Sequence, residues 1–468
     1  MELHGKSRAV LSVRNRRIDR ILRVVAAFAS LSMALTPVLA RADGGIGVVR
    51  DAETEALLYD YLRPIFKAAG VSPLPAIHLV PSDQFNAFVT GRNDMFVNTG
   101  AIVKTETPDE LTGVLAHETG HIANDDIARL TQQMQDTRGL VAMATLLGVG
   151  AAAAGAATHS SSAAQAGAGI ISGSNSVAYR SLLTFRRDQE SAADRNGLKY
   201  LTATAQSGAG MLAVLKRLAN DELMSANEVD PYLQNHPLSR DRVVALEEMV
   251  AKSPYLGKAD PPELQRRHNL VRAKLAAFTW PAQRVLREFP LSDNSLPARY
   301  ARAIVAYRSQ TPSAAQSQID GLIQSVPSDP YFLELKGQAL LDDGRPAQAI
   351  VPLRKAVALA PNAALIKILL GQALVALADP AKAPEAIDVL NSAMAREPDM
   401  GAGYRALGRA YALTGNEPMA QLATAQGLFV QGQFEDARIQ AVRAQAKLKK
   451  GTPAWLRADD IASYKPKS

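Results

Sequence analysis

Cysteine is absent from the 468 residues of this chain. The absence excludes disulfide bonds, thiolate metal ligands and a cysteine nucleophile, and it leaves no N-terminal cysteine for lipid attachment. Aromatic residues make up only 5% of the chain and there are only seven histidines, so a regular histidine pattern is informative. Without disulfides the chain must rely on its packed core for stability, even in an oxidising compartment such as a bacterial periplasm.

Net positive charge is also small outside the N-terminus. The net charge is +7, but residues 1–40 hold seven basic and two acidic side chains, a surplus of five that leaves only two for the rest. A basic region, an apolar run at 24–35 and then small residues are typical of a secretory signal. We therefore expect a signal peptide at 1–42, cleaved after Ala40 or Ala42, export to a periplasm, and no nucleic-acid partner.

The segment after the signal has a mixed pattern. Residues 53–69 place apolar side chains on one helical stripe, and residues 76–80 and 95–99 read as short strands. Thr107 and Glu110, with a proline between them, form the sequence of a capping box and predict that a helix begins there.

The motif H-E-x-x-H occurs at residues 117–121, inside this predicted helix. On a helix His117 and His121 lie on one face, four residues apart, and can bind one metal ion. Glu118 can then act as a general base toward a water molecule at that ion. The motif therefore favours a zinc hydrolase.

Two histidines do not complete a catalytic zinc site, which needs a third protein ligand. Glu190 and Asp194 are four residues apart in a second helical pattern and share a face. Glu190 is the candidate ligand, and Asp194 is the candidate acceptor for the N–H of a ligating histidine. An ordinary solvated helix face would carry similar charges, but each motif supplies what the other lacks.

Together these residues resemble the zinc metallopeptidase family of the CAAX prenyl protease and the membrane protease HtpX. The N-T-G sequence at 98–100 resembles the edge strand and turn of that family, and N-H-P-L at 235–238, followed by Arg242, resembles its His-Pro element. One departure is Asp125-Asp126, where relatives often carry a basic residue or histidine.

The resemblance implies one zinc ion per chain, bound by His117, His121 and Glu190. It also implies that Glu118 is the catalytic base and that Asp194 supports the ligands. His236 is a further candidate, either as the donor to the oxyanion that forms during peptide hydrolysis or as a fourth zinc ligand that keeps the resting enzyme inactive.

Between the two motifs, residues 139–157 are almost free of polar groups, and residues 158–176 are rich in Ser, Ala and Gly. We expect a close-packed helix and then a mobile loop over the active site. Two alternatives are a membrane span, as in integral-membrane relatives, and contact with a membrane surface.

The C-terminal part has an internal period. Gly337 recurs as Gly371 and Pro327 recurs as Pro361, both after 34 residues. This is the period of tetratricopeptide repeats, whose stacked helix pairs form a concave binding face.

The predicted fold class is α+β, with a mainly helical zincin-like metallopeptidase domain that contains a small β-sheet, followed by an all-α solenoid of tetratricopeptide repeats. The predicted organisation is a signal peptide at 1–42, a peptidase domain at 43–252, a helical connector at 253–292, repeats at 293–450 and a tail at 451–468.

This order of parts resembles periplasmic proteases of Gram-negative bacteria. The resemblance implies a zinc metalloendopeptidase whose substrates are unfolded or misassembled outer-membrane proteins and whose repeats dock on their assembly machinery. A peripheral membrane contact fits the same location. One alternative is a repeat-based chaperone or scaffold with a structural or regulatory zinc site, and another is an integral-membrane protease of the HtpX type.

Overall fold

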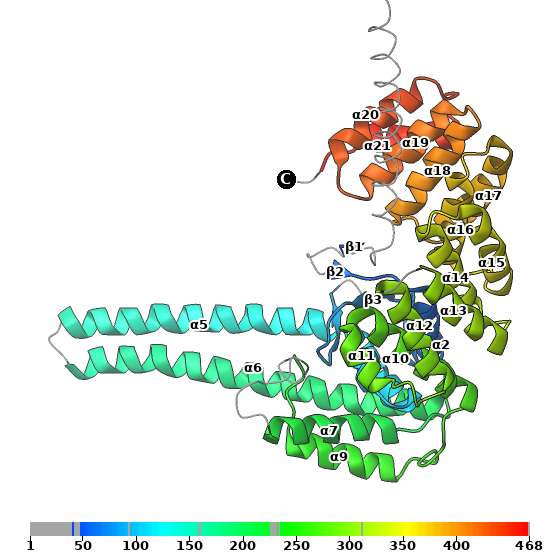
Figure 1. Ribbon diagram of the computed structural model, residues 1–468. Helices are drawn as coiled ribbons and strands as arrows, with labels where there is room; N and C mark the ends of the chain where they lie inside the picture. The colour runs from blue at the N-terminus through cyan, green and yellow to red at the C-terminus, as the bar shows by residue number, and fades with distance from the viewer. Residues whose placement is uncertain are drawn as a thin grey trace, which may run out of the picture. The chain divides into compact units, whose positions relative to one another are not determined.

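The computed structural model describes residues 40–41, 47–91, 94–157, 161–224, 232, 235–309 and 312–466. The predicted signal peptide lies outside these residues apart from Ala40 and Arg41. Two compact units are present, one built mainly from residues 54–279 and the other mainly from residues 280–468. Figure 1 shows their helices and strands. The predicted divisions at residues 42, 252, 292 and 450 stay predictions.

The first unit contains a three-stranded sheet. Its elements are α2 (Ala52–Ala69), β3 (Ala76–Val80), β4 (Ala87–Thr90) and β5 (Asp94–Asn98), preceded by the short strands β1 (Ala40–Arg41) and β2 (Gly47–Val48). The strand order is β3-β5-β4, with β3 parallel and β4 antiparallel to β5. The predictions for α2, β3 and β5 agree with the structure within one residue, whereas β4 was not predicted.

The helices of this unit follow the sheet in the chain. They are α3 (Thr99–Lys104), α4 (Pro108–Ala123), α5 (Asp126–Ala157), α6 (Ser161–Ala203), α7 (Ala209–Met224), α9 (Arg240–Ala251) and α10 (Pro262–Thr279). Helix α4 carries the H-E-x-x-H motif, and every residue from Pro108 to His121 except Asp109 is buried. Helix α10, in the predicted connector, packs against α3 and α4.

The predicted capping box at the start of α4 is wrong in its bonds. Thr107 is the N-cap, but its hydroxyl donates to Asp109 Oδ1 at 2.6 Å and caps no backbone N–H. Glu110 accepts from the backbone N–H of Glu106 at 2.8 Å, and the N–H of Asp109 donates to Asp260 at 2.9 Å. A distant carboxylate thus replaces the local cap, which the sequence pattern could not reveal.

Helices α4 and α6 pack backbone against backbone. A Cβ atom at Gly120 would lie 2.9 Å from the Cα and carbonyl oxygen of Ala193, closer than real Cβ atoms come. Glycine at position 120 therefore permits the approach. This contact brings the part of α6 around Glu190 to the H-E-x-x-H face of α4.

The segment 139–176 differs from its prediction. Instead of a close-packed helix and a loop, residues 139–157 belong to α5 and residues 161–176 to α6, and the two helices run side by side as a long helical hairpin (Figure 1). Large apolar side chains of α5 are exposed there rather than packed. Alanine is the strongest helix former, which explains why an Ala-rich stretch that also holds Ser and Gly is helical. No helix of the described residues is both long and apolar enough to cross a membrane.

The second unit is a row of helix pairs. Its elements are α11 (Ala282–Glu288), α12 (Leu296–Ser309), α13 (Pro312–Ser325), α14 (Pro330–Asp342), α15 (Pro346–Leu359), α16 (Ala364–Ala376), η1 (Pro380–Lys382), α17 (Ala383–Met394), α18 (Gly401–Leu413), α19 (Glu417–Phe429), α20 (Phe434–Gln445) and α21 (Pro453–Ser463). Helix α21 falls in the predicted tail and packs on α20 and α19.

The periodic glycines occupy equivalent close contacts between paired helices. A Cβ atom at Gly337 would lie 2.3 Å from Leu353 Cγ, and one at Gly371 would lie 2.4 Å from Leu390 Cγ. Each glycine thus provides space for the leucine of its partner helix. The same packing at a spacing of 34 residues confirms the predicted repeats.

Candidate metal centre

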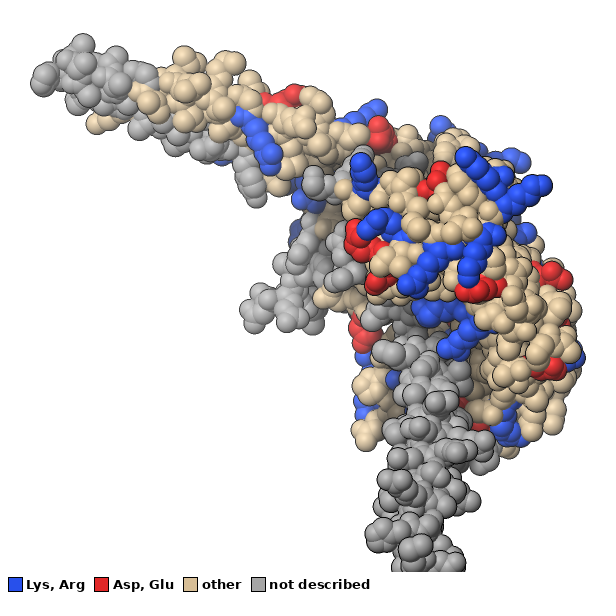
Figure 2. Space-filling view, turned by 90° about the horizontal axis from the view of Figure 1, so that it is seen from above, with Lys and Arg blue, Asp and Glu red and all other residues tan. Residues whose placement is uncertain are grey.

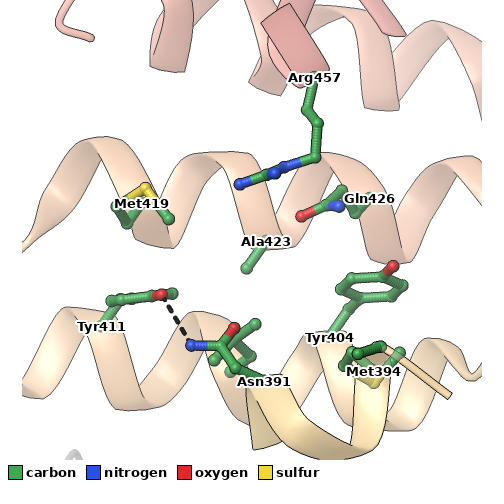
Figure 3. A pocket seen from close by; sticks show the side chains of 10 residues that line it. Asn391, Met394, Tyr404, Tyr411, Met419, Ala423, Gln426 and Arg457 are labelled. Atoms are coloured by element: carbon green, nitrogen blue, oxygen red, sulfur yellow. Dashed lines mark hydrogen bonds between the residues drawn. The ribbon is translucent and has the colours of Figure 1, made fainter. Parts of the chain in front are cut away.

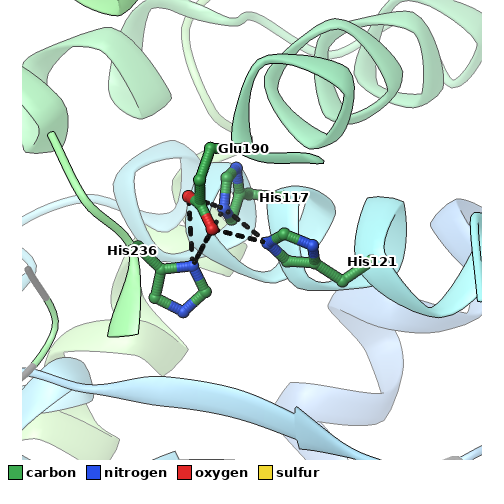
Figure 4. Close-up of side chains that lie close together, drawn as sticks. All are labelled: His117, His121, Glu190 and His236. Atoms are coloured by element: carbon green, nitrogen blue, oxygen red, sulfur yellow. Dashed lines mark hydrogen bonds and ion pairs between the residues drawn. The ribbon is translucent and has the colours of Figure 1, made fainter. Parts of the chain in front are cut away.

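Four side chains of the first unit meet in its interior. One ligand atom each from His117, His121, Glu190 and His236 can be chosen so that all lie within 4.8 Å of one another, and all four residues are buried. Figure 4 shows both histidines of α4, the carboxylate from α6 and His236 from the segment before α9 facing one point. The structure thus brings together the three predicted ligands and the further candidate His236.

Carboxylates fix the orientation of both α4 histidines. His117 Nδ1 lies 2.9 Å from Asp194 Oδ1, and His121 Nδ1 lies 2.7 Å from Asp126 Oδ2. A histidine whose Nδ1–H donates to a carboxylate presents the lone pair of Nε2. The two Nε2 atoms point inward and lie 3.1 Å apart.

The spacing of the inward atoms fits one small cation. Glu190 oxygens lie 3.4 Å from His117 Nε2 and 3.5 Å from His121 Nε2. His236 Nδ1 lies 3.3 Å from His117 Nε2 and 3.2 Å from Glu190 Oε1. Ligand atoms at about 2.05 Å from a tetrahedral zinc would lie about 3.3 Å apart. The residues present therefore suit a four-coordinate metal ion.

Glu118 has no hydrogen-bond partner among the described residues, although both of its carboxylate oxygens are buried. Its Oε1 lies 3.3 Å from His236 Nε2, but the pair does not have hydrogen-bond geometry. Burial and the nearby Glu190 raise the pKa of Glu118 to about 8, against the lowering effect of His117. A buried carboxylate without a partner is costly, which indicates a functional role for it.

Arg242 balances the negative charge of this interior. It is buried, its guanidinium donates to both oxygens of Asp194 at 2.8 and 3.0 Å, and its Nη1 lies 3.0 Å from Glu190 Oε2. The same Nη1 donates to the carbonyl oxygen of Pro237 at 2.9 Å, which ties the His236 segment to α6. Burial alone would raise the pKa of Asp194, but bonds with His117 and Arg242 lower it to about 2.

The pKa values of His117 and His236, which lie on either side of Glu190, shift in opposite directions. Burial would lower the pKa of His117, but its bonds with Asp194 and Glu190 raise it to about 10. Burial dominates at His236 and lowers its pKa to about 4. His236 is thus neutral near pH 7, as a metal ligand must be. His117 holds a proton when no metal is bound, so metal uptake must release one.

The position of His236 depends on aromatic packing. Its ring stacks on Tyr232 with centroids 4.5 Å apart, and Phe85, which precedes β4, packs edge-on against Tyr232 at 5.6 Å. Arg186 of α6 donates to the carbonyl oxygen of Asn235 at 2.7 Å. The segment that carries His236 is thus held by Phe85, next to the sheet, and by α6.

Asp126 is a site residue that the sequence prediction missed. Asp125 adopts a left-handed conformation with φ of 55°, which aspartate tolerates, and this turn places Asp126 beside His121. The only sequence signal was a carboxylate five residues after the second histidine, at the Asp125-Asp126 departure from the family pattern.

Strand β4 lies beside the site. It is an outer strand of the described sheet and packs near α4. An extended peptide can add to such an edge through main-chain hydrogen bonds, whatever its side chains.

Two histidines and a glutamate around one point, with an unpartnered glutamate on the same helix, define a metallopeptidase of the H-E-x-x-H type. Comparison with known families agrees. Residues 52–250 match peptidase family M48, and residues 300–364 match the tetratricopeptide repeat. The chain therefore carries an M48 peptidase domain followed by tetratricopeptide repeats, and the predicted α+β fold class is confirmed.

Two named relatives align with most of the chain, and a third aligns with a short part of it. The chain is 24% identical to the beta-barrel assembly-enhancing protease of Yersinia pestis over 403 residues, which cover 82% of this chain and 77% of the relative. The protein of that name from Escherichia coli K12 is 24% identical over 394 residues, 81% of this chain and 76% of its own length. An HtpX homolog of Pelotomaculum thermopropionicum is 44% identical over 73 residues, 15% of this chain and 26% of that protein.

We predict that Asp126→Asn weakens zinc binding by about 10- to 100-fold, because the amide no longer holds His121 as the carboxylate does. Competition with a zinc chelator measures the affinity. Asp125→Asn is the matched control, since Asp125 is exposed and asparagine also tolerates its backbone conformation. Equal affinities for the two variants would contradict the role of Asp126.

Proposed function

We propose that this chain is an exported zinc-dependent endopeptidase that degrades misfolded or stalled outer-membrane proteins in the envelope of a Gram-negative bacterium. Catalysis would reside in residues 43–252, residues 253–292 would connect the parts, and the repeats at 293–450 would dock substrates or partners. The observation that carries the proposal is the buried, unpartnered Glu118 beside the inward Nε2 atoms of His117 and His121.

Zinc is the proposed metal because two imidazoles and one carboxylate are a typical catalytic zinc set. When bound, zinc acidifies water and polarises the substrate carbonyl. Glu118 would accept the proton of the attacking water and then deliver it to the leaving amine. His117, His121 and Glu190 would hold the ion, and Asp194 would fix the ring of His117.

His236 fills the fourth corner of the cluster in this structure, which supports a resting state. Its Nδ1 lies within 3.3 Å of both His117 Nε2 and Glu190 Oε1. A catalytic zinc site keeps one position for water or substrate. We therefore favour His236 as a fourth ligand that must withdraw before catalysis, over its alternative role as oxyanion donor.

The substrate class follows from the setting of the site. Edge strand β4 offers main-chain hydrogen bonds to an extended peptide, and such binding requires an unfolded segment. The names of the two assembly-enhancing relatives support outer-membrane β-barrel proteins as clients. An enzyme that cleaves only unfolded chains would leave folded envelope proteins intact.

The repeats contain a pocket that could receive a side chain of the docked protein. It has a volume of about 460 Å³ and lies between helices of the second unit (Figure 3). Buried apolar and aromatic residues form much of its wall, and polar groups of Asn391, Gln426 and Arg457 complete the lining. We propose that this pocket takes an apolar side chain of a client or of the assembly machinery.

A chaperone or scaffold with a closed structural zinc site is the second candidate, because His236 completes a set of four ligands. A structural site has no use for a buried carboxylate such as Glu118 next to the ligands. This difference favours the peptidase. The remaining alternative is an integral-membrane protease. Such a protein would stay in the membrane fraction on alkaline extraction, whereas a peripheral or soluble protease would be released.

Glu118→Gln should lower the degradation of casein and of an unfolded β-barrel protein by about 10² to 10⁴-fold, because the amide cannot accept the proton. Bound zinc, measured by atomic absorption, should stay at one ion per chain. Equal proteolysis by wild type and Glu118→Gln would contradict the mechanism.

His236→Ala should raise the basal cleavage of casein, since the fourth metal position becomes open to water. His78→Ala is the control, because His78 is a half-buried histidine that bonds to Asp94 on the sheet outside the cluster. Reduced cleavage with unchanged zinc content would instead assign His236 as the oxyanion donor.

Met419→Glu should raise the KM for an unfolded β-barrel protein roughly tenfold, because the variant places a carboxylate in the apolar pocket of the repeats. Cleavage of a short peptide should keep its rate. Val351→Glu, at an exposed apolar position of α15, is the control. An unchanged KM for Met419→Glu would exclude the pocket from docking.

A further inference from the structure

The outer part of the α5–α6 hairpin exposes large apolar side chains to solvent. On α5 and α6 the exposed fractions run from 54% to 74% for Leu140, Met143, Leu146, Leu147, Val149 and Val177. Five of these six side chains fall within ten consecutive residues of one helix. Isolated exposed apolar side chains are ordinary, but a dense group of them marks an interaction surface.

The exposed face is broad. Successive residues of an α-helix are 100° apart, so Leu140, Leu147 and Val149 together span about half of the circumference of α5. The other half, with Val141 and Gly148, is partly or fully buried, and α6 runs beside it. A groove in a protein partner covers a narrower stripe of a helix, whereas a membrane interface accepts a face of this width.

Charge is absent from the same part of the hairpin. From residue 139 to residue 179 the sequence has no Asp, Glu, Lys or Arg, and this run is bounded by Arg138 on one side and Arg180 on the other. In Figure 2 the described atoms along the projecting arm are mostly tan, with blue and red side chains toward its base. Lipid would tolerate such a surface, and water disfavours it.

The two arginines lie at nearly the same level of the hairpin. Gln133 of α5 bonds to Ser181 of α6, so these positions are level with each other. Arg138 lies five residues further out than Gln133, and Arg180 lies one residue further out than Ser181. At a rise of about 1.5 Å per residue, the two arginines differ by about 6 Å along the axis. Both are exposed, and neither has an ion-pair partner within the described part of the chain. Arginines at the end of an apolar segment are suited to lipid phosphates.

We propose that the outer part of the α5–α6 hairpin docks on a bilayer surface that carries anionic headgroups. The exposed apolar side chains of α5, from Leu140 on one side of its face to Val149 on the other, enter the boundary between headgroups and acyl chains. Arg138 and Arg180 bind phosphates at that level. This partner goes beyond the proposed proteolytic function, because it places the peptidase at a membrane without using any residue of the metal centre.

The absence of cysteine makes a direct test straightforward. Leu147→Cys in the full chain is labelled with an environment-sensitive fluorophore and mixed with vesicles of phosphatidylethanolamine and phosphatidylglycerol. We expect a blue shift of the emission and quenching by brominated acyl chains. Val351→Cys, an exposed position on α15 of the second unit, is the control and should show neither. Lack of a shift at position 147 would overturn the proposal.

Two further variants test the chemistry of the contact. Leu146→Asp should abolish the blue shift of the position-147 label, and Arg138→Glu with Arg180→Glu should weaken vesicle binding roughly tenfold and remove its salt dependence. Vesicles of phosphatidylcholine alone should bind the unmodified chain weakly. Equal binding to both vesicle types would contradict the role of anionic headgroups.

Sedimentation without lipid distinguishes self-association of the chain from membrane binding as the role of the exposed apolar face. A dimer that Leu146→Asp dissociates, together with no blue shift on vesicles, would assign the hairpin to self-association and overturn the proposal. Casein cleavage should be unchanged in Leu146→Asp. Loss of membrane contact is thereby distinguished from loss of the proposed peptidase activity, which Glu118→Gln tests.

Discussion

The buried ion pairs of Arg242 are the interaction on which the rest of the site depends. Asp194 and Glu190 lie in a dry interior, where an uncompensated carboxylate would be strongly destabilising. The guanidinium bonds to both of them and also to the carbonyl oxygen of Pro237. One side chain from α9 therefore adds to the effect of His117 in keeping Asp194 ionised, holds the ring of His117 through Asp194, and fixes the segment that carries His236.

This arrangement requires α4 and α6 to lie unusually close together. Gly120 permits the contact with Ala193, and the approach places Glu190 of α6 within 3.5 Å of both histidines of α4. A side chain at position 120 would separate the helices and break the ligand set. The spacing of the motif along α4 is thus necessary for the site. The site also requires the close packing of α4 and α6, which brings Glu190 to the two histidines.

The sequence predicted the parts of the site that depend on helical spacing. His117, His121, Glu190 and Asp194 follow from i,i+4 geometry and from the number of ligands that zinc needs, and the structure brings them together. Their roles stay predictions.

What the sequence missed depends on contacts between distant segments or on a single turn. Asp126 reaches His121 only through the left-handed turn at Asp125, and Asp260 displaces the local cap of α4 from 151 residues away. The α5–α6 hairpin was mistaken for a packed helix and a loop, because its composition suits burial, whereas large apolar side chains of α5 are in fact exposed.

The charges around the candidate metal site also link metal uptake to the ionisation of Glu118. Without metal, the neighbouring carboxylates hold a proton on His117, and burial keeps the pKa of Glu118 near 8, so Glu118 is largely protonated at neutral pH. A cation among the ligands would replace the His117 proton and, being close to Glu118, would favour its ionised form. Glu118, the proposed base, would then be ionised only when the site is loaded. Burial of this glutamate, which is a cost to folding, thereby ties its basicity to the presence of the metal.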